Sequence, residues 1–218
     1  MKTLSYEEAR RVYNRVGSMQ DSQAFYEDVA TRELVRHGDF PSAKSVFEFG
    51  CGTGRFAQTL LRDHLGPTAT YRAVDLSPTM IGLATRRLSS IGDRVRVALT
   101  DGSPPASEPP ASCDRFVSNY VFDLLSDADI VAVISEAHRM LRPGGLLCLS
   151  SLSAGSSALS RTVSRIWSFL HRVNPQLVGG CRPVALPAFF ENGPWKLRHH
   201  KAVAPFGLPS EVVIAERL

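Results

Sequence analysis

Three glycines at alternate positions follow a short apolar run, and an acidic residue stands two places before the first of them: Glu48-Phe-Gly50-Cys-Gly52-Thr-Gly54-Arg55. Glycine is required where the backbone turns sharply and where the atoms of a ligand approach the main chain. The amino end of a helix after such a turn offers unpaired N–H groups to a negatively charged part of the ligand. The segment therefore predicts a strand–turn–helix corner that binds a nucleotide-like molecule.

The spacing of these glycines distinguishes between kinds of nucleotide site. A dinucleotide-binding turn has the pattern Gly-x-Gly-x-x-Gly/Ala, and the third small position counted from Gly50 is Arg55. A phosphate-binding P-loop is excluded because no Gly-Lys-Ser/Thr follows. Glu48 would repel a pyrophosphate and attract a cationic ligand. A Rossmann-type nucleotide-binding oxidoreductase is therefore disfavoured as an alternative function, and a non-catalytic binding module with the same fold is a second alternative.

Apolar runs and helical patterns alternate along the chain, which is typical of an α/β protein with a parallel sheet. The predicted strands are Ser45–Phe49, Thr70–Asp75, Val95–Leu99, Arg115–Ser118, Leu146–Ser151, Leu197–Ala204 and Glu211–Glu216. The predicted helices are Arg55–His64, Pro78–Ser89 and Asp127–Leu141, the last of which should end at Pro143-Gly144-Gly145. The segment from Asp101 to Cys113 contains four prolines and is predicted to be a loop.

Two segments lie outside this alternation. The first 40 residues have a helical pattern, and Ser156–Val173 reads as an amphipathic helix. We expect its apolar stripe to pack against the rest of the molecule, with three arginines off the stripe. The stripe consists of Leu159, Val163, Ile166 and Leu170, and the arginines are Arg161, Arg165 and Arg172.

The glycine segment resembles the first motif of the class I S-adenosylmethionine-dependent methyltransferases, which holds the methionine part of the cofactor. Four further segments resemble later motifs of that family, in the same order. They are Ala73-Val-Asp75-Leu-Ser-Pro-Thr-Met80, Thr100-Asp101-Gly102, Cys113-Asp-Arg-Phe-Val-Ser-Asn119-Tyr-Val-Phe122 and Leu141-Arg-Pro-Gly-Gly-Leu-Leu147. The resemblance covers residues 44–151.

This resemblance implies a Rossmann-like, doubly wound, seven-stranded and mostly parallel sheet with helices on both faces and an N-terminal helical lid. We expect a single methyltransferase domain over residues 1–218. Its parts would be a lid over residues 1–40, a cofactor-binding core over 44–151, an insertion with a lid helix over 152–194, and the last two strands over 195–218.

The resemblance also implies roles for individual residues in binding S-adenosylmethionine. Asp75 would accept hydrogen bonds from both ribose hydroxyls, which a carboxylate does well because it is charged. Leu76 and Met80 would flank the adenine, and Asp101 would accept from its amino group. The implied cofactor-binding set is Glu48, Gly50, Cys51, Gly52, Gly54, Arg55, Asp75, Leu76, Met80, Asp101, Gly102, Asn119 and Tyr120.

The implied reaction is an in-line SN2 transfer of a methyl group from the sulfonium to a nucleophilic atom of a small-molecule acceptor, which leaves S-adenosylhomocysteine. Positioning and desolvation supply most of the catalysis, and a general base is needed only for an acceptor that is protonated at neutral pH. No catalytic residue stands out, and the weak candidates are Tyr120, Asp123 and Tyr13. The residues expected to line the substrate pocket are Tyr13, Phe25, Tyr26, Phe122 and Trp167.

The segment after the fourth strand narrows the acceptor. Family members that methylate amino groups of nucleobases usually carry Asn/Asp-Pro-Pro-Tyr there, whereas this chain has Asn119-Tyr-Val-Phe122. We therefore expect no nucleic-acid partner, and a small-molecule acceptor as in the ubiquinone- and menaquinone-biosynthesis-like branch. The methylated atom (O, N, S or C) is left open.

Composition excludes other classes of protein. The chain has 218 residues, of which 44% are hydrophobic, which is enough to form a packed core. Its apolar runs are too short to span a bilayer. The four cysteines form no CxxC pair and no apolar leader is visible, which predicts reduced thiols and a cytoplasmic location. No metal site is predicted, because His199-His200 has no other suitably spaced ligand.

Charge is unevenly distributed. The net charge is +4, and residues 151–201 carry seven lysines and arginines against one glutamate. Such a segment attracts anionic partners. We expect at most a weak association of the basic 161–172 helix with a membrane surface.

Overall fold

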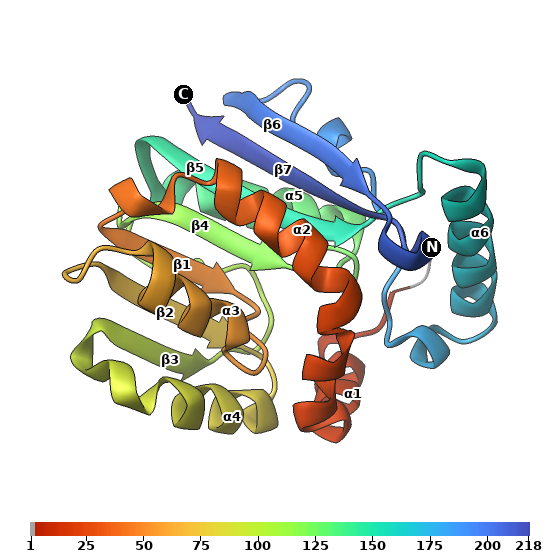
Figure 1. Ribbon diagram of the computed structural model, residues 1–218, viewed down its shortest axis with the longest axis horizontal. Coiled ribbons are helices and arrows are strands. Elements are labelled where there is room, and N and C mark those ends of the chain that lie inside the picture. Colours follow the sequence, from red (N-terminus) through yellow and green to blue (C-terminus); the bar gives the residue numbers. More distant parts are fainter. Residues whose placement is uncertain (1–2) are drawn as a thin grey trace.

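A computed structural model describes residues 3–218, apart from the side chains of residues 23 and 24. Its centre is a seven-stranded sheet in the order β3-β2-β1-β4-β5-β7-β6 (Figure 1). The first five strands in this order pair in parallel, and β7 is antiparallel to both of its neighbours. The strands are β1 (Ser45–Phe49), β2 (Thr70–Asp75), β3 (Val95–Leu99), β4 (Cys113–Asn119), β5 (Leu141–Leu152), β6 (Trp195–Val203) and β7 (Ser210–Arg217).

Helices cover both faces of the sheet. In Figure 1, α2, α3 and α4 lie in front of it and α5 lies behind it, so the predicted doubly wound, mostly parallel α/β fold is confirmed. The α-helices are α1 (Tyr6–Val16), α2 (Ala24–His37), α3 (Arg55–Thr59), α4 (Pro78–Leu88), α5 (Asp127–Met140) and α6 (Ala158–Val173). We call α1, the 3-10 helix η1 (Gly17–Gln23) and α2 together the lid.

The side chains of β1 point alternately to the two faces of the sheet and join two separate clusters of buried residues. Phe47 and Phe49 point to the α5 side, where they join the buried residues of that helix. Val46 points to the opposite side, which contains Leu34 of α2 and Leu60 after α3. Because successive side chains of a strand face opposite ways, Glu48 lies on the α2 and α3 side, among apolar residues. This placement determines its chemistry.

Most predicted bounds agree with the structure to within two residues, and two differ by more. The predicted helix over residues 55–64 is α-helical only to Thr59 and continues as one π-helical turn, Leu60–His64. β5 begins at Leu141 rather than Leu146, because Leu141 already pairs with Cys113 across a bulge in β4. Among the described residues, those between β3 and β4 form the loop that their prolines predicted.

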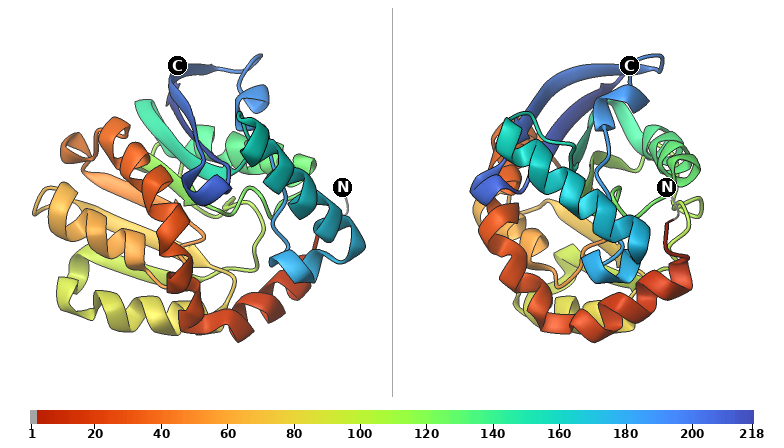
Figure 2. Two further views of the ribbon diagram at one scale, coloured as in Figure 1. Left: turned by 45° about the vertical axis from the view of Figure 1, so that its right-hand side comes forward. Right: turned by 90° about the vertical axis from the view of Figure 1, so that its right-hand side faces the viewer.

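The packing predicted for α6 is wrong. Leu159, Ile166 and Leu170 of its apolar stripe are exposed, whereas Ser160, Ser164 and His171 are buried. The helix crosses the end of the sheet toward which the parallel strands point (Figure 2). There Val163 lies beside Leu152 and Leu208, and other contacts are to backbone carbonyls. Trp167 Nε1 donates to the carbonyl of Cys181 at 2.9 Å, and His171 Nε2 lies 3.2 Å from the carbonyl of Gly180. Small and hydrogen-bonding side chains suit that contact better than an aliphatic stripe does.

Candidate active site

A cavity of about 940 Å³ opens at the carboxyl ends of β1, β2 and β4, between these strands, the lid and α3. Ligand sites of open α/β sheets lie at this edge, and the volume falls in the range of small-molecule sites. Residues from the predicted motifs form one wall: Glu48, Gly50, Cys51, Gly52, Thr53, Arg55, Asp75, Leu76, Met80, Asn119, Tyr120 and Val121. The lid contributes another, including Tyr13, Gln20, Asp21, Glu27, Asp28, Thr31, Arg32, Val35, Arg36 and His37.

The turn between β1 and α3, residues 48–55, which we call the glycine corner, needs its glycines for different reasons. A Cβ on Gly50 would lie 2.2 Å from Val121 Cγ2, and one on Gly54 would lie 3.0 Å from the backbone of Ala84 in α4. A Cβ on Gly52 would meet no atom within 4 Å. All three residues have positive φ, which favours glycine. Gly50 and Gly54 therefore allow tight packing, and Gly52 leaves open space in front of the main chain.

Asp75 stands at the end of β2 and is held by the backbone. Its Oδ2 accepts from the N–H of Gly52 and its Oδ1 from the N–H of Ser77, both at 2.8 Å. Burial raises the pKa of this carboxyl, and the backbone hydrogen bonds act against that effect. Each oxygen keeps a second lone pair. Asp75 can therefore accept further hydrogen bonds from a ligand at a fixed position in the cavity wall.

Glu48 is 1% exposed and accepts a hydrogen bond from the hydroxyl of Tyr71 at 2.9 Å. Burial raises its pKa to about 8, and the nearby carboxylate of Asp75 adds to the shift. Cys51, beside it, is also buried, and burial raises the pKa of its thiol. At neutral pH Glu48 is therefore mostly protonated, and a positively charged ligand group beside it would lower its pKa and favour the carboxylate. The protonated thiol of Cys51 is a poor nucleophile.

Three polar contacts hold the lid against the motif wall. Thr53 Oγ1 donates to Asp21 Oδ1 at 2.6 Å, and Arg87 of α4 bonds both of these residues. Arg55, at the start of α3, pairs with Asp28 of α2 at 2.6 Å. The third contact, in α1, is the hydrogen bond that Asn14 accepts from the hydroxyl of Ser77 at 2.7 Å. The sequence reasoning found none of these lid residues, because only the polarity of the lid signals them and that is also typical of a solvated surface.

The acceptor end of the cavity is formed after β4. Tyr120 has φ +53°, an uncommon conformation for a residue with a side chain, and its hydroxyl donates to Ser210 Oγ at 3.0 Å. Its ring meets that of Tyr26 edge to face, with 5.8 Å between centroids. Asn119 accepts from Ser150 at 2.7 Å, whereas its buried Nδ2 has no hydrogen-bond partner within the described part of the chain. A buried amide donor without a partner is costly, so this group is available to a ligand.

Two carboxyls beside Tyr13 have unusual acidity. Asp123 is fully buried, and burial raises its pKa to about 7, although hydrogen bonding from the main chain at Leu152 and the charge of Arg182 act against that effect. Glu27 of α2 lines the cavity, and burial raises its pKa to about 7 as well, with the charge of Asp123 adding to the shift while Arg55 opposes it. Burial also raises the pKa of Tyr13, whose hydroxyl lies 3.9 Å from Cys181 Sγ. Sequence reasoning missed Glu27.

Several predicted site residues lie elsewhere. Asp101 is exposed and bonds its own neighbour Ser103, while Gly102 packs under the ring of Tyr6. Neither residue lines the cavity, nor does Phe122, which is buried in the core on the α5 side. Three further substrate-pocket candidates are also absent from the lining: Phe25, which is 55% exposed, Tyr26, whose ring packs against Tyr120, and Trp167, which donates to the carbonyl of Cys181. Gly54 and Asp123 are not among the lining residues either.

Within residues 3–218, no helix is both long enough and apolar enough to cross a membrane.

Comparisons with known proteins agree with this geometry. Residues 46–145 match a family model described as a methyltransferase domain. The malonyl-(acyl-carrier protein) O-methyltransferase of Marinomonas sp. (strain MWYL1) is 29% identical over 169 residues, which are 77% of this chain and 59% of that protein. The demethylmenaquinone methyltransferase of Tropheryma whipplei (strain Twist) is 28% identical over 67% of this chain and 59% of its own length. The chain thus spans a little over half the length of these curated relatives.

Solved structures show the same fold. The crystal structure of the 4+2 cyclase SpnF superposes with a TM-score of 0.74 over 100% of this chain and 98% of that one, at 14% sequence identity. At such low identity the likeness concerns the fold, and a fold can host several activities. The family is given by the matched domain, which includes the glycine corner, Asp75 and the start of the acceptor end. Residues 46–145 thus form a methyltransferase domain of the class I S-adenosylmethionine-dependent kind.

Proposed function

We propose that this chain transfers the methyl group of S-adenosylmethionine to an acceptor that enters beside Tyr120. The observation that carries the proposal is the glycine corner with Asp75, within the matched domain and on the wall of a 940 Å³ cavity. When bound, S-adenosylmethionine supplies a methyl group on a positively charged sulfur. The remaining work, which is binding, orientation and proton transfer, falls to residues of this chain.

The cavity fits this cofactor. Open space in front of Gly52 admits a ligand close to the main chain, and Asp75 is fixed by two backbone N–H groups so that it can accept from a ribose. Asn119 offers a buried amide donor without a partner among the described residues. The buried acid Glu48 suits a cationic ligand. Asp101 and Gly102 belong to this proposal only through the family resemblance, because neither lines the cavity.

We propose that Asp123 and Glu27 take up the proton that an acceptor must lose. A base works best when its pKa lies near the working pH, and both carboxyls have pKa values of about 7. Glu27 lines the cavity, and Asp123 lies next to the lining residue Tyr13. The two groups interact, so their titration belongs to the pair. Tyr13 and Tyr120 would orient the acceptor through their hydroxyls.

The acceptor class follows from the relatives and from α6. Those relatives are named for a carrier-bound malonyl group and for demethylmenaquinone, so we propose a small acceptor, either free or tethered to an acyl carrier. The exposed apolar stripe of α6, with Arg161, Arg165 and Arg172 around it, favours an anionic carrier or surface. Transfer to a tethered acceptor should then weaken with salt and in Arg165→Glu, while transfer to a free acceptor should not. Equal responses would remove α6 from the proposal.

Calorimetry with S-adenosylhomocysteine tests the cofactor site. Asp75→Ala should weaken binding by about 30-fold, which corresponds to about 2 kcal/mol, because a charge-assisted hydrogen bond is lost. Asp101→Ala is the matched control, an acid at the next strand end that faces solvent. Unchanged affinity in Asp75→Ala would refute the ribose assignment. Tight cofactor binding with no S-adenosylhomocysteine formed on free or carrier-bound acceptors would favour the non-catalytic binding module instead.

A further inference from the structure

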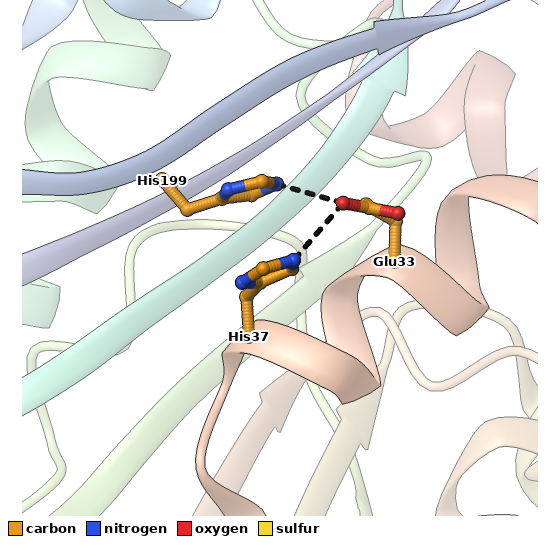
Figure 3. Close-up of side chains that lie close together, drawn as sticks. All are labelled: Glu33, His37 and His199. Atoms are coloured by element: carbon orange, nitrogen blue, oxygen red, sulfur yellow. Dashed lines mark ion pairs between the residues drawn. The ribbon is translucent and has the colours of Figure 1, made fainter.

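Three metal-ligating side chains from two distant parts of the chain meet at the opposite end of α2 from Glu27, where His37 is also one of the residues that line the cavity. Glu33 and His37 lie one turn apart at the carboxyl end of α2, and His199 lies on β6 (Figure 3). One ligand atom of each lies within 4.8 Å of the other two. Glu33 Oε1 is 3.1 Å from His37 Nε2 and 3.1 Å from His199 Nε2. The sequence showed no second metal ligand at a suitable spacing from His199, whereas the fold brings Glu33 and His37 next to it.

Local structure explains why His199 faces α2. A bulge between Leu197 and His199 shifts the pairing of β6 with β7, and bulges redirect side chains at sheet edges. His200 instead approaches Glu211 of β7, with 3.1 Å between Nε2 and Oε2. The two adjacent histidines therefore have different surroundings, and His200 is a natural control for His199.

The cluster is incompletely satisfied as it stands. His199 Nε2 is buried and makes no hydrogen bond of good geometry within the described chain, although Glu33 Oε1 is close to it. The rings of His37 and His199 stack at 3.7 Å between centroids and 8° between planes, which brings their ring nitrogens to the same carboxylate oxygen. The nitrogen of a neutral imidazole can act as a metal ligand.

We propose that Glu33, His37 and His199 form a binding site for a divalent transition metal of the zinc class. Two imidazoles and one carboxylate are a donor set that binds Zn²⁺, with an open fourth position for water. The lone pair of an imidazole nitrogen lies in the ring plane, so the two rings must turn out of their stack to share one ion. With side-chain exposures of 36% for His37 and 19% for His199, they have room to do so.

The site would clamp the lid to the edge of the sheet. α2 carries Glu27 and Asp28, which line the cavity near its amino end, and its other end would be tied to β6 by the ion. Lys201 also approaches Glu33, with Nζ 2.9 Å from Oε2. The lysine holds the carboxylate in place through the oxygen that the histidines do not face, but its charge opposes a cation nearby.

Zinc binding to the purified full-length chain tests the proposal without any methyl-transfer assay. Equilibrium dialysis against Zn²⁺ alone should give one ion per chain, and His37→Ala and His199→Ala should each weaken binding by at least tenfold. Because an ion that binds only the folded state stabilises it, saturating Zn²⁺ should raise the melting temperature by roughly 5 °C in the wild type and not in these variants. His200→Ala should behave as the wild type, and Lys201→Ala should bind Zn²⁺ more tightly.

Cobalt substitution identifies the ligands. Co²⁺ bound to imidazole and carboxylate should give the visible bands of a low-symmetry site without the thiolate charge-transfer absorption that binding to cysteine would add. Thiolate absorption, less than a tenth of an ion per chain in the wild type, or equal binding by wild type and His199→Ala would each overturn the proposal. All three outcomes are independent of cofactor binding, so the metal site can fail while the methyltransferase proposal holds.

Discussion

The two walls of the cavity are built by different means. The glycine corner positions a ligand with the main chain: Gly50 and Gly54 allow close packing, and the N–H of Gly52 orients Asp75. The wall formed by the lid and the acceptor end relies on ionisable side chains, above all Glu27, with Asp123 buried behind it. The first wall therefore depends mainly on sterics, although burial raises the pKa of Glu48 within it to about 8, whereas the second depends mainly on protonation.

The largest effect should come from adding a single methyl group to the glycine corner. In Gly50→Ala the Cβ would collide with Val121 and the residue would keep φ +82°, so we expect a loss of about 2–4 kcal/mol in the free energy of unfolding. Gly52→Ala meets no protein atom. It should cost about 1 kcal/mol of stability yet weaken S-adenosylhomocysteine binding at least tenfold, because its methyl group occupies the space left for the ligand.

Chemical denaturation and calorimetry on the two variants check this contrast. Gly50→Ala as stable as the wild type would show that Val121 moves aside without cost. Normal cofactor affinity in Gly52→Ala would place the ligand away from the main chain, and the proposed difference between the two walls would then disappear.

The steric wall could be predicted from the sequence because its constraints are local. Glycine spacing indicates a backbone turn, and Asp75 is the last residue of a strand, and the structure has Gly50, Gly52 and Asp75 beside the cavity. Asp101 shows the limit of this reasoning. Its motif lies in the expected place, but the side chain bonds Ser103 and faces solvent.

The lid wall could not be predicted because its contacts join residues far apart in the chain. Glu27 is one of several acids in a polar helix, and only its burial beside Asp123 raises its pKa. For α6 the error arose from a general expectation that an apolar stripe is buried. The surface it meets includes backbone carbonyls, which Trp167 and His171 approach, and most of the stripe is left exposed, Val163 excepted.

A second prediction concerns the pH dependence of stability at Asp123. Its pKa is about 7 in the folded protein against an ordinary value of 3.8, so the folded state binds the extra proton and the free energy of unfolding falls as pH rises from about 4 to about 7. Asp123→Asn removes the buried charge. It should match the wild type at about pH 3, below both pKa values, and exceed it at pH 8 by a few kcal/mol.

The same variant should lose activity on an acceptor that must be deprotonated. We expect a fall of about 10² in kcat/KM at pH 8, together with a flatter pH–rate profile, because a positioned base contributes about that factor. Thermal unfolding at the two pH values checks the stability effect. Equal stability of variant and wild type at pH 8 would show that the pKa of Asp123 is not raised in the folded protein, and the pH dependence would then rest on Glu27 alone.

The smallest effect concerns the join between the walls, where Asp21 of the lid bonds Thr53 of the glycine corner and Arg87 of α4. Asp21→Asn and Arg87→Met should each weaken S-adenosylhomocysteine binding about threefold to fivefold, because the corner loses a neighbour that fixes its geometry. The double variant should lose less than the sum, with a coupling free energy of about 1 kcal/mol, as expected for a half-buried ion pair. Arg86→Met is the control on the adjacent, exposed residue.

Strictly additive losses would mean that the lid and the glycine corner bind the cofactor independently. A coupling of this size would instead explain how a ligand enters: thermal motion can break a side-chain join worth about 1 kcal/mol, whereas the main-chain wall behind it stays in place.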